Sequence, residues 1–475
     1  MRVPFSPEKI REANSYLRKH QLSLSRILTP PRLDLGLIVV IPCYNEPNIG
    51  LVLDCLWHCK RPACGVEVIV LVNAVYADAP HVHAQNQWTV MFTKNWIAAH
   101  QDDSLQFHVL DFPGLPPRHA GVGLARKLGM DEAVARFTAA GNPDGIIACL
   151  DADCCCDGNY LTALVAHFRA SLESPGCAVY FEHPLDSKTL YDSSIDLKIT
   201  SCENNQIPSS INDDQLARRA RAAIVGYELH LRYYVHGLRY AGSPYAFYTV
   251  GSCMAVRTRI YEKQGGMNRR KAGEDFYFLQ KIIGLGNFTE LRSTRVLPSP
   301  RISERVPFGT GRMIGNSLGR GEHVFYTYAP EVFRDLRLFL SRIGNLYDDE
   351  KVDSRFVTDY LTMDPAAAEL SEYLPAFLTR QRFNERWAEI RRNAASSRTF
   401  RKRFHHWFNA LLTLQFIHFA TAHRYPKISV EQAAHRLLEW SGEKQNSVNH
   451  SNGNTSDQQE TLLLRYRTID REGVG

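Results

Sequence analysis

The sequence lacks a long hydrophobic run and a recognisable export signal. No apolar stretch reaches the roughly 20 residues of a membrane-spanning helix, and the first residues, MRVPFSPEKIREANSYLRKH, have no apolar centre of the kind found in a signal peptide. No dense basic stripe interleaved with aromatic residues is present, and the formal net charge is only +6. Nucleic acid is therefore not an expected partner.

The sequence also lacks the paired CxxC motifs, or Cys and His couples, of a structural zinc site. It has eleven cysteines, three of them consecutive at 154–156. Cys55, Cys59 and Cys64 form a looser group, whose spacing is more typical of buried free thiols than of a metal site. Reduced thiols and the absence of an export signal together predict a cytoplasmic protein.

What the sequence does contain is an ordinary globular composition, with 44% hydrophobic and 22% charged residues in 475. This length predicts more than one domain. The expected regions are a helical N-terminal extension (1–35), an α/β domain (36–325), a basic helical C-terminal region (326–443) and a disordered polar tail (444–475).

One C-terminal stretch, FHHWFNALLTLQFIHFA (404–420), is apolar around most of a helical circumference. Such a helix is typically buried, and burial is the favoured interpretation. The alternative is a peripheral association of this region with the inner face of an anionic membrane, because four basic residues precede it.

The α/β domain is predicted from β-rich apolar runs that alternate with helical patterns. The expected strands are Leu37–Ile41, Val66–Asn73, Leu105–Phe112 and Ile146–Leu150. Without hairpin signals between them, the pattern indicates a Rossmann-like, mostly parallel sheet with helices on both faces. Ligands of such sheets bind beyond the carboxyl ends of the strands, where this chain has several polar residues.

Two of these polar residues are Asp151 and Asp153, which follow the fourth strand. In an extended chain, residues i and i+2 point to the same side, so both carboxylates would face one cation. Mg²⁺ and Mn²⁺ prefer oxygen ligands of this kind, often together with substrate phosphates. The alternative is an exposed acidic turn that caps the next helix.

Four motifs that occur in a fixed order are more specific than the aspartate pair alone. They are VVIPCYNEP on the first strand, GVGLARKLGMDEA in a helix, ACLDADC on the fourth strand, and GEDFYFLQKI further on. Together they resemble a GT-A fold glycosyltransferase of the family 2 type, over residues 36–325. The resemblance implies sugar transfer from a UDP- or GDP-sugar to a glycan, a lipid-linked or a small-molecule acceptor.

The resemblance also implies roles for individual residues of the donor site. The residues expected at the nucleotide are Pro42, Tyr44, Asn45, Glu46, Asn73, Arg126 and Asp151. Asn73 stands where the family normally has an aspartate that contacts the base, which puts the usual uridine preference in doubt. Asp151 and Asp153 match the metal-binding motif, and His323 is a candidate third ligand, although a lone histidine is more often structural.

A second acidic pair, Glu274 and Asp275, opens a helix. Acidic residues often stabilise helix N-termini without any catalytic role. The resemblance instead implies that Asp275 is the general base of an inverting transfer, with the metal stabilising the leaving diphosphate.

Two other functions fit this fold class. A sugar-phosphate nucleotidyltransferase would normally carry a glycine-rich, basic phosphate loop after the first strand, where this chain has PCYNEPNIG. A catalytically degenerate nucleotide-sugar-binding protein would not be expected to keep Asp151, Asp153 and Asp275. The sequence therefore predicts a metal-dependent glycosyltransferase.

Overall fold

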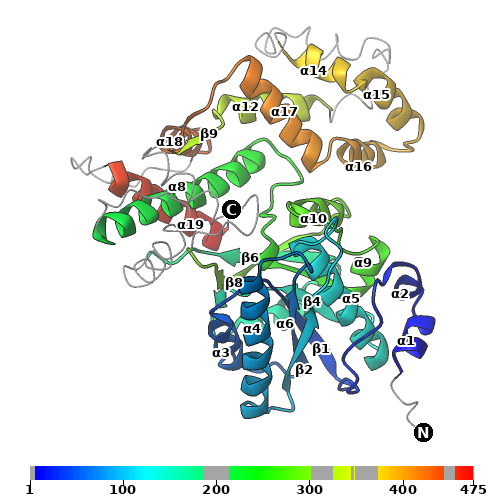
Figure 1. Cartoon of the computed structure of the whole chain (residues 1–475). Helices are drawn as coiled ribbons and strands as arrows, with labels where there is room; N and C mark the ends of the chain where they lie inside the picture. Colours follow the sequence, from blue (N-terminus) through cyan, green and yellow to red (C-terminus); the bar gives the residue numbers. More distant parts are fainter. Residues whose placement is uncertain are drawn as a thin grey trace. The chain divides into compact units, whose positions relative to one another are not determined.

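The computed structural model describes residues 6–185, 213–300, 325–343, 347, 373–442 and 455–473 (Figure 1). The chain divides into two compact units, which are described separately. The first comprises Met1–Ala220, Thr249–Gly319 and Asp470–Gly475, and the second Arg221–Tyr248 and Arg320–Ile469. This division differs from the predicted regions, because a segment from the middle of the expected α/β domain belongs to the helical unit.

The first unit contains an eight-stranded sheet with the order β3-β2-β1-β4-β7-β6-β8-β5. Its strands are β1 (Leu35–Cys43), β2 (Gly65–Asn73), β3 (Leu105–Phe112), β4 (Ile146–Cys149), β5 (Cys155–Cys156), β6 (Gly176–Phe181), β7 (Met254–Arg257) and β8 (Thr289–Leu297). β1 to β4 run parallel, β7 is antiparallel to both β4 and β6, and β8 is parallel to β6 but antiparallel to β5. The prediction of a mostly parallel α/β sheet is confirmed.

The central strand β1 contains Pro42, which has no N–H to donate to a neighbouring strand. The amide of Leu150 donates to the carbonyl of Val40, so Val40 and, two residues later, Pro42 face the β4 side. The ladder with β4 ends at the pair of Val40 and Cys149. Pro42 is tolerated because it lies just past the last pair on its own side.

Helices cover both faces of this sheet. α3 (Ile49–Trp57) and α4 (Pro80–Ala99) connect β1 to β2 and β2 to β3, whereas α5 (Val122–Ala140) leads back across β1 to β4. With right-handed crossovers, α3 and α4 lie on one face and α5 on the other. The remaining helices of the unit are α1 (Pro7–Ala13), α2 (Ser15–His20), α6 (Tyr160–Ala170), α9 (Thr258–Lys263) and α10 (Glu274–Ile283).

Helix α5 is buried although its sequence is highly charged. Every residue from Gly123 to Phe137 is buried, because α5 lies between the sheet and helices α1, α2, α9 and α10. Its charged side chains have partners inside the unit. Lys127 Nζ lies 2.9 Å from Asp131 Oδ2, and Ser25 Oγ donates to Glu132 Oε1 over 2.5 Å. Pairing of this kind is what makes burial of charged groups tolerable.

The second unit is mainly helical. Its elements are α8 (Asp213–Tyr240), β9 (Tyr326–Thr327), α12 (Glu331–Ile343), α14 (Leu374–Arg380), α15 (Phe383–Arg392), α16 (Ser397–Trp407), α17 (Ala410–His423), β10 (Ile428–Ser429), α18 (Val430–Trp440) and α19 (Thr455–Glu472). The first residues of α8, up to Ala220, belong to the first unit. The predicted helical C-terminal region is confirmed. Phe339 of α12 lies at the centre of an aromatic core with Phe404, Phe408 and Phe416.

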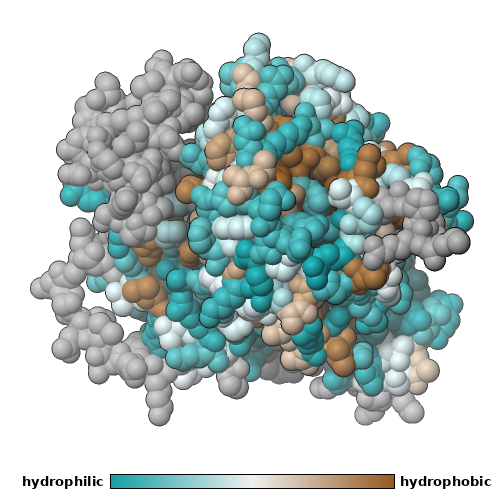
Figure 2. All heavy atoms as spheres, turned by 90° about the horizontal axis from the view of Figure 1, so that it is seen from below, coloured by the Kyte–Doolittle hydropathy of each residue, from teal (hydrophilic) through white to brown (hydrophobic). Residues whose placement is uncertain are grey.

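The apolar stretch 404–420 spans two helices, α16 and α17, and most of its large apolar side chains are buried, although Trp407 and Phe419 are partly exposed. Phe404, Phe416 and Ile417 are all 0% exposed, as the favoured interpretation predicted. Within the described residues, no helix combines the length and hydrophobicity needed to cross a bilayer. The face of the molecule in Figure 2 is mostly hydrophilic, with hydrophobic residues gathered in smaller patches.

The predicted disordered tail is wrong for residues 455–472, which form α19. Leu462, Leu463 and Tyr466 are buried, and Tyr466 donates its hydroxyl hydrogen to the carbonyl of Ala434 over 3.1 Å. The polar composition of the region as a whole concealed this short helical pattern of apolar residues.

Candidate functional site

The predicted site residues follow the carboxyl ends of the parallel strands. The registers pair Cys43 with Val72 and Val40 with Cys149, so the residues after β1, β2 and β4 emerge along one edge of the sheet. β7 begins beside the end of β4, where Cys149 pairs with Met254. The turn before β7, at Gly251–Cys253, therefore belongs to the same edge.

Asp151 and Asp153 lie in a turn, not in the extended chain that the sequence predicted. β4 ends at Cys149, and the amide of Cys154 donates to the carbonyl of Asp151 over 3.1 Å. Their ligand atoms and the Cys154 Sγ nevertheless all lie within 4.8 Å of one another. The turn therefore brings the two carboxylates together by a different geometry from the predicted one.

The donor set of this turn fits a hard divalent cation. Two carboxylates are typical ligands of Mg²⁺ and Mn²⁺. Burial raises the pKa of the Cys154 thiol well above its usual range, and sulfur is in any case a soft ligand that suits Mg²⁺ and Mn²⁺ less well than oxygen. The predicted third ligand, His323, lies outside the described residues.

Arg126 of α5 joins the two predicted acidic motifs. Its guanidinium forms ion pairs with Asp151 and with Glu274 at the start of α10. The Arg126 side chain is 3% exposed, whereas that of Asp151 is 37% exposed. The structure therefore brings the Asp151 turn and the Glu274–Asp275 pair to one site, with Asp151 on its accessible side.

Two glycines permit this close approach. A Cβ on Gly251 would overlap the Arg126 guanidinium, and a Cβ on Gly123 would overlap the backbone carbonyl of Arg270. The first glycine leaves room for the guanidinium, and the second lets α5 approach the segment that precedes α10.

Burial dominates the titration of the second acidic pair. Burial raises the pKa of Glu274 to about 7; the Arg126 charge opposes this rise, and the nearby Asp275 charge adds to it. Burial likewise raises the pKa of Asp275, against the effects of Arg126 and of the Phe276 amide, which donates to Asp275 Oδ1 over 2.7 Å. A perturbed carboxyl pair of this kind is typical of functional sites.

The raised pKa of Glu274 predicts a specific pH dependence of stability. Between about pH 4.5 and pH 7 the folded protein holds a proton on Glu274 that the unfolded chain has released, so this group lowers the free energy of unfolding as pH rises. Glu274→Gln removes this contribution. We expect the variant to gain stability relative to wild type across that window, and no further above it.

Urea unfolding of both proteins at several pH values between 4 and 8 measures this difference. Glu173→Gln, at an exposed position of the same unit, is the control. If the difference in free energy of unfolding between wild type and Glu274→Gln stayed constant from pH 4.5 to 7, the raised pKa of Glu274 would be contradicted.

The loop after β1 is held by an asparagine that the sequence analysis missed. The amide of Asn45 donates to Asn86 Oδ1, and Asn86 Nδ2 donates to the carbonyl of Asn73, both over 2.9 Å. Asn86 is buried in α4 and thereby fixes the ends of β1 and β2 relative to each other. A signal was available, because Asn86, Thr89 and Thr93 recur at helical spacing in the polar and aromatic stretch between the second and third predicted strands.

The other predicted nucleotide-site residues differ in how accessible they are. Tyr44 is partly exposed and donates to Asp78 Oδ1 over 3.1 Å. Asn45 has a positive φ of 49°, a conformation that asparagine adopts more readily than most residues. Glu46 is fully buried and its carboxylate accepts from the amide of Asn48 over 2.9 Å, so it stabilises the turn into α3. Asn73 is buried at the end of β2.

Comparisons with known proteins leave the family of this chain open. No family model matches the sequence, and no curated protein matches it. Among solved structures, Staphylococcus aureus TarS 1–349 is similar at 12% identity and a TM-score of 0.33, covering 78% of this chain and 91% of that chain. The same protein in complex with UDP-GlcNAc is similar at 13% identity and a TM-score of 0.34, covering 91% of this chain and 92% of that one. Likeness at this level decides neither family nor activity.

Proposed function

We propose that the protein is a metal-dependent glycosyltransferase that transfers a sugar from a nucleotide-sugar donor to an acceptor hydroxyl with inversion. The observation that carries this proposal is the Arg126 bridge between Asp151 and Glu274. It joins a turn suited to a divalent cation and a carboxyl pair suited to proton transfer, at the sheet edge where α/β proteins bind ligands.

The charge balance of the site supports binding of a cation. Arg126 is surrounded by the carboxyl groups of Asp151, Glu274 and Asp275, and Asp153 lies beside Asp151. Even with Glu274 partly protonated near neutral pH, the carboxylates outnumber the one guanidinium, so the site as it stands attracts further positive charge. Asp151 and Asp153 would hold Mn²⁺ or Mg²⁺, which supplies Lewis-acid stabilisation of the leaving diphosphate.

The chain's own residues account for the remaining steps. Asp275 accepts the proton of the acceptor hydroxyl as its oxygen attacks the anomeric carbon of the sugar, and the nucleoside diphosphate leaves from the opposite face. Arg126 holds Glu274 and Asp151 in place. Its Nε is buried without a hydrogen-bond partner among the described residues, so a donor remains for an oxygen of the bound substrate.

The proposed donor is a UDP- or GDP-sugar that binds along the ends of β1 and β2. Tyr44 and Asn45 belong to the loop after β1, and Asn73 ends β2. An asparagine side chain offers a donor and an acceptor to a base edge, where an aspartate would offer acceptors only. This difference is the reason to test guanine and uracil nucleotides side by side.

A thermal-shift screen of UDP, GDP and their sugars, with and without Mn²⁺, tests the proposal. We expect one nucleotide to raise the melting temperature only when Mn²⁺ is present, because binding to the folded state stabilises it. The response should be lost in Asp153→Ala and retained in the control Asp144→Ala, because Asp144 precedes β4 and the acidic turn follows the other end of that strand. Absence of any nucleotide response in the presence of metal would reject the proposal.

A further inference from the structure

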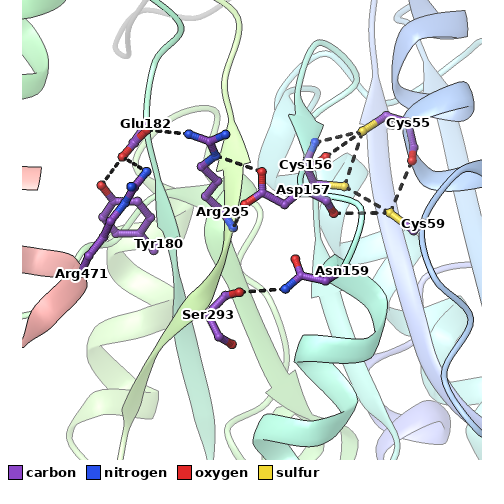
Figure 3. A network of polar contacts seen from close by, with 10 residues as sticks. All are labelled: Cys55, Cys59, Cys156, Asp157, Asn159, Tyr180, Glu182, Ser293, Arg295 and Arg471. Atoms are coloured by element: carbon purple, nitrogen blue, oxygen red, sulfur yellow. Dashed lines mark hydrogen bonds and ion pairs between the residues drawn. The ribbon is translucent and has the colours of Figure 1, made fainter. Parts of the chain in front are cut away.

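Three cysteines of the first unit lie in contact beside the acidic turn. Cys156 of β5 has its Sγ 3.6 Å from that of Cys55 in α3 and 3.8 Å from that of Cys59, which follows α3 (Figure 3). Cys64 is not part of this thiol cluster, because its Sγ lies against Gly36 at the start of β1. Cys156, the third member of the cluster, belongs to the run of three consecutive cysteines at 154–156.

The thiol cluster is arranged as one accessible sulfur and two enclosed ones. Cys55 is partly exposed, whereas Cys59 and Cys156 are only 3% and 7% exposed. The amide of Cys156 donates to Cys55 Sγ over 3.0 Å, which stabilises negative charge on that sulfur. Hydrogen bonds from the neighbouring thiols of Cys155 and Cys156 lower the pKa of Cys55 well below its usual range. A partly exposed sulfur that accepts a backbone hydrogen bond, in contact with a buried thiol, is the arrangement of a reactive cysteine pair.

We propose that Cys55 and Cys156 form a reversible disulfide, and that Cys59 exchanges into it as an alternative partner of Cys156. The oxidant is a small-molecule disulfide of the glutathione type. The Cys55 thiolate attacks it, forming a mixed disulfide and releasing one thiolate. Cys156 loses its proton and attacks the Cys55 sulfur, which releases the second thiol. Two protein thiols thus give two electrons and two protons to one disulfide.

This bond would act on the acidic turn through β5. The backbone of β5 pairs with β8, and the next residue, Asp157, forms an ion pair with Arg295 over 2.9 Å. Arg295 in turn lies 3.0 Å from Glu182, which also pairs with Arg471 (Figure 3). These contacts hold β5 on the β8 side. Closing the sulfur atoms from contact to the roughly 2.05 Å of a disulfide draws Cys156 toward α3, against these contacts, and displaces the turn that carries Asp151 and Asp153.

The test is a thiol count on the full chain after incubation with glutathione disulfide. We expect two thiols to be lost, peptide mapping to find Cys156 linked to Cys55 or Cys59, and dithiothreitol to restore both thiols. Cys156→Ser and Cys55→Ser should each abolish the Cys55–Cys156 link, and Cys64→Ser should retain it. An unchanged thiol count, or a link that omits Cys156, would overturn the proposal. Thiols that react only after a chelator is added would overturn it in favour of a bound metal.

The effect on the turn is measured separately and rests on the proposed function. We expect the oxidised protein to bind Mn²⁺ at least about threefold more weakly than the reduced protein, because its carboxylates are displaced. Equal affinities would reject the coupling. Failure of both forms to bind Mn²⁺ would reject the proposed metal site, while the thiol count would still decide whether the disulfide forms.

Discussion

Replacing Asp275 by asparagine is expected to lower kcat by about 10²- to 10⁴-fold, the usual contribution of a positioned general base. Asparagine has nearly the same shape, and its Oδ1 can still accept from the Phe276 amide, which now donates to Asp275 over 2.7 Å. It cannot take a proton from an acceptor hydroxyl at neutral pH. The fold and the donor site should therefore persist while proton transfer is lost.

Two measurements separate this role from a structural one. The Mn²⁺-dependent thermal shift with the nucleotide should be unchanged in Asp275→Asn, and the acidic limb of the wild-type pH–rate profile should disappear. Asp144→Asn, which alters an exposed aspartate paired with Arg259, is the matched control. A kcat within tenfold of wild type would mean that Asp275 is not the base.

Arg136→Met is expected to destabilise the first unit by about 3–5 kcal/mol, the effect of breaking a buried ion pair from one side. Arg136 of α5 is 0% exposed, and its Nε and Nη2 donate to the Glu67 carboxylate over 2.8 and 2.5 Å. Glu67 lies within β2 and is 2% exposed. Without the guanidinium, the buried Glu67 charge keeps only His108 beside it, whose Nε2 lies 3.9 Å away and whose pKa burial lowers to about 4.

A second substitution tests this explanation directly. In the double variant Arg136→Met, Glu67→Leu both charges are gone, and most of the lost stability should return. Arg32→Ala, which breaks an exposed pair with Asp34, should change the free energy of unfolding by no more than about 1 kcal/mol. Urea unfolding measures the change in the free energy of unfolding, and hydrogen exchange of peptides from β1 and β2 shows whether the first unit is the one destabilised. A double variant as unstable as Arg136→Met would contradict the explanation.

The parallel strands were predictable because their apolar runs end at residues that interrupt them. Pro42, Asn73 and Asp151 mark these ends, and the observed β1, β2 and β4 lie within a few residues of the predicted ranges. The last two strands in the sheet order, β8 and β5, were not predictable. β5 is only two residues long, and β8, with the sequence TELRSTRVL, has charged residues between its apolar positions. Such strands exist because a neighbour offers unpaired backbone groups, which local sequence does not reveal.

The candidate site was predictable as a set of residue types and not as a set of contacts. Asp151 and Glu274 belong to motifs that can be recognised in the sequence. The link between them depends on Arg126, which lies 148 residues before Glu274. The burial of α5 was equally inaccessible, because a helix with so many charged residues reads as exposed until its partners on other elements are known.

The pairing of Glu182 with Arg471 has a consequence for how the chain is made. The two residues are separated by 289 positions, yet both belong to the first unit. At a translation rate of about 5–20 residues per second, Glu182 leaves the ribosome about 15–60 s before Arg471. Arg295 follows Glu182 by 113 residues, so for the later part of that interval the β6–β8 side of the sheet holds Arg295 but not its final arginine. A nascent chain stalled before residue 470 would therefore present an unfinished sheet to chaperones, even with all eight strands already synthesised.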